Sequence, residues 1–91
     1  MTIDYHALGV YSEAAETARQ AAHDRTLALN DLTRLLTLTS GGGMALARSL
    51  DRDQANRLWN QVQAADTRMM DAVGIANAAA PLCGRPLLAV R

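Results

Sequence analysis

The sequence predicts an all-α protein, a long antiparallel hairpin of two helices with a coiled-coil-like, alanine-rich seam. Three observations lead to this fold class. Residues 4–39 and 51–80 contain no proline. In both segments apolar residues recur at alternating steps of three and four, which is the spacing of a helix that packs along another helix. Between the segments, Gly41-Gly42-Gly43 interrupts any helix and lets the chain reverse. With 91 residues there is room for one domain, 1–91.

The first helix is expected over about 4–39, with Asp4 as its N-cap. Its predicted seam holds Leu8, Tyr11, Ala15, Ala18, Ala22, Arg25, Leu29, Leu32 and Leu36. Arg25 is the one charged residue among these positions. We interpret it as a long side chain that reaches outward to Asp24 or Asp66, or that fixes the register of the two helices.

The second helix is expected over about 51–80, after a glycine turn and connector at 40–50, with Asp51 as N-cap. It is expected to end before Pro81, which leaves a non-helical tail at 81–91. The apolar tail packs either on its own hairpin or on a partner chain. The predicted seam is Ala55, Leu58, Val62, Ala65, Met69, Ala72, Ala76 and Ala79. When the chain folds back on itself, the two seams face each other if the numbers of the paired residues sum to 90 or 91.

A second line of small residues on the first helix is not used by this predicted seam. It consists of Ala7, Ala14, Ala21, Ala28 and Leu35. Because two helices alone bury little surface, this line predicts a homodimer that forms a four-helix bundle. The alternatives are a monomer whose tail covers the line, a larger assembly, or an obligate complex with another protein.

Composition argues against several classes of function. Nine arginines, with no lysine, balance nine acidic residues, so no overall basic field attracts nucleic acid or anionic lipid. His6 and His23 lie about 25 Å apart along one helix, and Cys83 is the only cysteine. We therefore expect no catalytic residue, no metal, no cofactor and no enzymatic activity. No segment reads as a secretory signal or as long enough to span a membrane, so a cytoplasmic protein is predicted.

Recognition of a partner protein remains as the predicted function, of bacterial or phage type. The candidate contacts are Trp59, Met70, Val73, Arg48, Arg52 and Arg57. One alternative is a nucleic-acid-binding hairpin dimer that uses Arg34 with Arg48, Arg52 and Arg57, although Asp51 and Asp53 offset that charge. Another is a structural subunit of a helical assembly, or a secreted hairpin.

Two kinds of helical hairpin are similar in layout. Plasmid-encoded antisense-RNA-binding hairpin dimers resemble the chain in length and heptad pattern alone. Secreted helical hairpins with a Trp-x-Gly turn are similar too, but here the turn is Gly41-Gly42-Gly43 and Trp59 lies inside a predicted helix. Neither similarity assigns a role to a particular residue.

Overall fold

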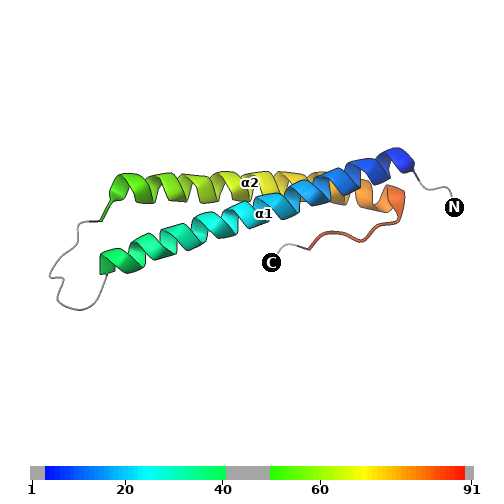
Figure 1. Cartoon of the computed structure of the whole chain (residues 1–91). Coiled ribbons are helices and arrows are strands. Elements are labelled where there is room, and N and C mark those ends of the chain that lie inside the picture. The colour runs from blue at the N-terminus through cyan, green and yellow to red at the C-terminus, as the bar shows by residue number, and fades with distance from the viewer. Residues whose placement is uncertain (1–3, 41–49, 90–91) are drawn as a thin grey trace.

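The computed structural model of the protein describes residues 4–40 and 50–89. Two helices, α1 (Tyr5–Ser40) and α2 (Arg52–Cys83), lie side by side and antiparallel, and the chain measures 68 × 20 × 14 Å (Figure 1). This confirms the predicted all-α hairpin. The glycine turn, and the connector except for Ser40 and Leu50, fall outside the described residues.

Both predicted N-caps are confirmed. The Asp4 carboxylate accepts a hydrogen bond of 3.0 Å from the backbone N–H of Ala7, at the third position of α1. At the start of α2, the Asp51 carboxylate accepts a 3.0 Å bond from the N–H of Gln54. Each carboxylate satisfies an amide that has no partner within its helix, so short-range chemistry determines where both helices begin.

The end of α2 differs from the prediction. The helix runs through Pro81 to Cys83, so the expectation that it stops before Pro81 is wrong. Pro81 lies in the last turn, where its missing N–H removes a single helical hydrogen bond. The turn is closed instead by Gly84, and the N–H groups of Gly84 and Arg85 both bond to the carbonyl of Ala80. Because Ala80 and Cys83 are buried, packing against α1 stabilises this last turn.

Gly84 gives the first testable prediction. Its φ of 69° and ψ of 23° are left-handed, a conformation that costs other residues about 1–2 kcal/mol. An added Cβ would meet no atom within 4 Å, so only this conformational cost counts. Gly84→Ala should therefore lower the free energy of unfolding in urea by about 1 kcal/mol. Gly84→Asn should lose less, since asparagine tolerates this conformation; equal losses for both variants would contradict the assignment.

Two ion pairs between the helices define their register. Arg25 Nη1 lies 2.6 Å from Asp66 Oδ1, and Arg68 Nη2 lies 2.5 Å from Asp24 Oδ2. The residue numbers of these pairs sum to 91, as in the predicted register, and to 92, one more than predicted. Of the two acceptors that the sequence left open for Arg25, Asp24 and Asp66, it is Asp66 that the side chain reaches.

The seam of α1 is rotated relative to the prediction. Ala7, Ala14, Ala21 and Ala28 are only 0–7% exposed and face α2, so the prediction that the hairpin does not use this line is wrong. Leu29 and Leu36, expected in the seam, are exposed instead. The physical reason is that two lines of residues flank Tyr11 and Ala18 on α1, the alanine line and the line that contains Leu29. Either line, combined with Tyr11 and Ala18, gives the same alternating steps of three and four residues. The alanine line allows the closer approach of the two backbones.

This rotation corrects the predicted dimer interface. Ala7, Ala14, Ala21 and Ala28 are buried within one chain, and Leu35, at the end of their line, is half-buried. The four alanines are therefore not available to a second chain while the hairpin is intact. Dimerisation itself stays a prediction, and it requires a different face.

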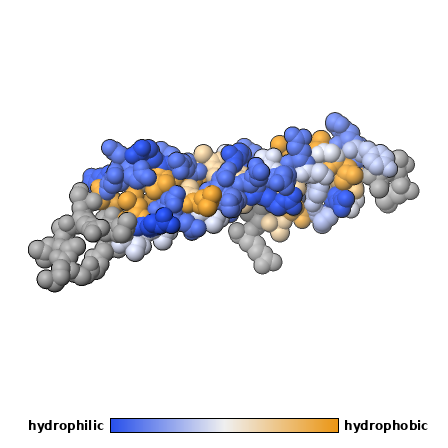
Figure 2. Space-filling view, in the orientation of Figure 1, coloured by the Kyte–Doolittle hydropathy of each residue, from blue (hydrophilic) through white to orange (hydrophobic). Residues whose placement is uncertain are grey.

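The core is made largely of alanine. It is concentrated where the N-terminal half of α1 packs against the C-terminal half of α2. One buried cluster surrounds Tyr11, and a second joins Ala18 and Ala21 to Met69, Ala72 and Val73. Nearer to residues 41–49, hydrophobic residues between the helices reach the surface, as Figure 2 shows. The large side chains Leu29, Leu36 and Trp59, all in this half, are exposed.

Candidate interaction surface

The residues after α2 fold back along the hairpin (Figure 1). The Tyr11 hydroxyl donates a 2.9 Å hydrogen bond to the carbonyl of Pro86. The Asn77 side chain bonds Leu88 twice, accepting from its N–H at 2.7 Å and donating to its carbonyl at 3.2 Å. Residues 85–89, which we call the tail, are therefore held on their own chain, one of the two arrangements that the sequence left open.

The tail adds a third layer to one side of the hairpin, which we call the tail face. Leu88 packs against both buried clusters. Leu8, Ala15 and Ala22 of α1 also pack against these clusters, and Leu88 lines one groove together with Ala15 and Ala22. Part of this face is thus covered by the chain itself.

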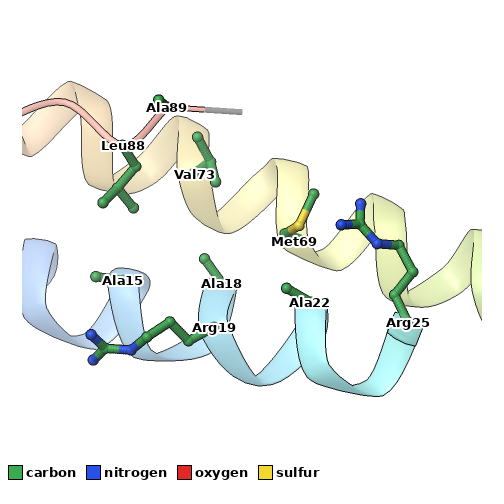
Figure 3. A pocket seen from close by; sticks show the side chains of 9 residues that line it. All are labelled: Ala15, Ala18, Arg19, Ala22, Arg25, Met69, Val73, Leu88 and Ala89. Carbon is green, nitrogen blue, oxygen red and sulfur yellow. The ribbon is translucent and has the colours of Figure 1, made fainter. Parts of the chain in front are cut away.

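A groove of about 360 Å³ continues the tail face beyond Ala89 (Figure 3). Its lining is mostly small and apolar, with Ala15, Ala18, Ala22, Met69, Val73, Leu88 and Ala89 joined by Arg19 and Arg25. Leu88 lies at one end of the groove, and at the other the Arg25 guanidinium reaches from α1 towards α2, where it meets Asp66. This ion pair separates the groove from the half of the hairpin nearer to residues 41–49.

Beyond the ion pair the same face carries exposed apolar side chains. On α1, Leu29 and Leu36 follow Ala22 at steps of seven, and on α2, Trp59 precedes Asp66 by seven, so all three lie on the tail face. Their exposed fractions are 39%, 47% and 49%. The half-buried Leu32 and Ala55 lie between them. We call these five residues the uncovered apolar face.

The uncovered apolar face has uncharged sides and charged ends. On α1 the flanking positions are Thr26 and Thr33, and on α2 they are Asn56 and Gln63. Arg52 precedes Trp59 by seven residues and therefore lies on the same line of α2, and the Arg25–Asp66 ion pair borders the other end of the face. Asp31, paired with Arg34 at 3.9 Å, lies about 200° around α1 from Leu29 and lines a separate hollow with Asp24 and Arg68.

The predicted partner contacts are brought together only in part: Arg52, Trp59 and Met70 lie on one face of α2, because steps of seven and eleven residues return to nearly the same side of a helix. Trp59 and Met70 are exposed, whereas Val73 is buried in the core cluster and is wrong as a surface contact. Arg48 lies outside the described residues. Arg52 and Arg57 are both exposed but lie five residues apart, about 140° around α2, so they do not share a face. Sequence reasoning missed Leu29 and Leu36 as surface residues, because it placed their line in the seam.

Among residues 4–40 and 50–89, no three His, Cys, Asp or Glu side chains are grouped to hold a metal ion. The Cys83 thiol is buried, with its Sγ 3.4 Å from the carbonyl of Ala79. Neither described helix is apolar over enough of its length to cross a membrane.

Comparison with known proteins gives no relative. No family model, no curated protein and no solved structure matches the chain. The uncovered apolar face is consequently the feature from which a function is inferred.

Proposed function

We propose that the chain is a small non-enzymatic protein-interaction module, an adaptor, inhibitor or regulator of bacterial or phage type. It acts by burying the uncovered apolar face against another polypeptide. The observation that carries this proposal is the exposure of Leu29, Leu36 and Trp59 on one face of the hairpin. The buried single thiol supports a reducing, cytoplasmic compartment.

The physical support is that the exposed apolar residues of the uncovered apolar face lie next to one another. Scattered exposed apolar residues are ordinary on a soluble protein, but a contiguous group within a polar edge is typical of a binding site. Tryptophan is also enriched among the residues that dominate binding energy, since it buries a large area with little loss of rotamer freedom. Trp59 therefore is the expected anchor.

Binding to nucleic acid has less support. Four arginines, at positions 19, 25, 34 and 68, are already paired with carboxylates. Arg52 and Arg57 point to different sides of α2, so they do not form the single basic surface that phosphate recognition requires. A structural subunit of an assembly would also use the uncovered apolar face.

The proposal is tested by capture of partners from the cells in which the chain is made, with wild-type protein and two matched variants as baits. Trp59→Glu places a charge on the uncovered apolar face. Ile75→Glu, the control, places the same charge at another exposed apolar residue of α2, on the far side from Val73. We expect a protein that binds the wild type and Ile75→Glu but is lost, at least tenfold, with Trp59→Glu.

Circular dichroism at 222 nm checks that both variants keep their helices. Equal capture by all three baits would contradict the proposal, because binding would then not depend on Trp59. Recovery of nucleic acid that depends on Arg52 and Arg57 would replace it with the alternative.

A further inference from the structure

We propose that the hairpin carries a binding site for an extended segment of another protein, and that its own tail is the ligand that fills this site within one chain. The site, which we call the tail site, consists of Tyr11, Asn77 and the apolar surface under Leu88. It lies near the other end of the hairpin from the uncovered apolar face (Figure 1). It therefore goes beyond the proposed function and is tested independently of it.

The polar groups of the tail site bind the backbone of the tail. The Asn77 side chain accepts a 2.7 Å hydrogen bond from the N–H of Leu88 and donates one of 3.2 Å to the carbonyl of the same residue. The Tyr11 hydroxyl donates a 2.9 Å bond to the carbonyl of Pro86. None of these three bonds involves a side chain of the tail, so they recognise an extended backbone and not a sequence. Sites for extended peptides obtain affinity in this way, and a pocket for one side chain adds specificity.

Leu88 is the side chain that occupies such a pocket. It is half-buried, it packs against both buried clusters, and it lines one groove together with Ala15 and Val73 (Figure 3). The other residues of the tail, 85–87 and 89, are exposed. A segment of another protein with a leucine at this position would therefore make the same contacts as the tail.

The tail is held weakly enough to be replaced. A segment that completes a core buries most of its side chains, whereas the tail buries only Leu88, and that one in part. Ordering the backbone of one residue costs about as much free energy as one hydrogen bond contributes, so three bonds offset only part of the cost of ordering five residues. Because the tail is tethered, it competes with an external segment at an effective concentration on the order of millimolar. The tail thus acts as an autoinhibitory ligand.

The groove beyond the tail indicates which segments fit best. A ligand that continues past the position of Ala89 lies along the groove, over Ala22 and Met69. The two charged residues of the lining, Arg19 and Arg25, are already paired with carboxylates, so the groove does not select an acidic ligand. The ligand class is therefore an extended apolar segment with a leucine at the position of Leu88.

The test is the binding of a fluorescein-labelled peptide, with the sequence of residues 85–91, to the full chain. Fluorescence anisotropy is measured from about 10 µM to about 1 mM, the range of weak complexes. Leu88→Glu removes the leucine of the chain's own tail from the site. Leu87→Glu, the matched control, places the same charge on the exposed neighbouring residue and leaves the tail bound. We expect the peptide to bind Leu88→Glu at least tenfold more tightly than it binds the wild type or Leu87→Glu.

Two further changes show whether the peptide occupies the tail site. Asn77→Ala, added to Leu88→Glu, removes both bonds to the backbone and should weaken peptide binding at least tenfold, with helicity at 222 nm unchanged. A peptide that itself carries Leu88→Glu should not bind. From the cells in which the chain is made, Leu88→Glu should then capture a protein that Leu87→Glu does not, and the unmodified peptide should release it.

Three outcomes would overturn the tail site. They are no binding of the peptide to Leu88→Glu, equal binding to Leu88→Glu and Leu87→Glu, and binding that Asn77→Ala does not weaken. Capture of no protein that the peptide releases would overturn the assignment to another protein, as would a dimer of the chain that the peptide dissociates. Trp59→Glu should leave peptide binding unchanged, so a failure of this inference and a failure of the proposed function are distinguishable.

Discussion

Replacing Ala21 by glutamate should unfold the hairpin. Ala21 is 0% exposed and packs in the cluster with Met69 and Val73, so a carboxylate there is removed from water, and the arginine one turn on, Arg25, is already paired with Asp66. An uncompensated buried charge costs about 3–5 kcal/mol, and the longer side chain also forces apart two helices that meet through alanine. Small domains have total stabilities of about 5–15 kcal/mol. We therefore expect a large loss of helical signal at 222 nm, or a strongly lowered urea midpoint.

The matched control is Gln20→Glu, which adds the same side chain at the adjacent exposed position of α1. It should change the free energy of unfolding by less than about 0.5 kcal/mol, as surface substitutions usually do. A well-folded, monomeric Ala21→Glu would contradict the structure, because it would place the alanine line between chains and not within one.

Replacing Tyr11 by alanine should give the second large loss. The ring belongs to a buried cluster with Ala76, Ala79 and Cys83, and its hydroxyl bonds to the carbonyl of Pro86 in the tail. Truncation of a buried aromatic ring costs about 3–5 kcal/mol, through lost transfer energy and the cavity that remains. The measurement is urea unfolding at 25 °C, followed by circular dichroism.

Tyr11→Phe separates the ring from its hydrogen bond. This variant keeps the packing and removes only the bond to Pro86, so it should cost about 0.5–1.5 kcal/mol. It should also speed hydrogen exchange of the Leu88 amide, which is bonded to Asn77, because the tail is held at fewer points. If Tyr11→Phe lost as much stability as Tyr11→Ala, the hydroxyl and not the ring would be the main contribution.

Much of this fold follows from local chemistry that the sequence displays directly. Asp4 and Asp51 cap the helices because a short carboxylate can reach an amide three residues on. The pairing of Arg25 with Asp66 follows from a register that matches apolar residues on two periodic seams. These features depend on spacing along the chain, so they could be predicted without a structure.

The candidate site could not be predicted in the same way. Spacing alone does not choose between the alanine line and the line of Leu29 and Leu36, since both flank Tyr11 and Ala18 with equal periodicity. That choice decides whether Leu29 and Leu36 are buried or available to a partner.

By itself the sequence determined the class of fold, the starts of the helices and their register, because each depends on residues at fixed separation in the chain. Only the tertiary structure decided which line of α1 faces α2, that α2 continues through Pro81, and where the tail lies. The reason is that these depend on contacts between distant segments, such as Tyr11 with Pro86 and Asn77 with Leu88, together with close helix packing through alanine. The tail covers one half of a face, and the other half remains uncovered as the candidate site.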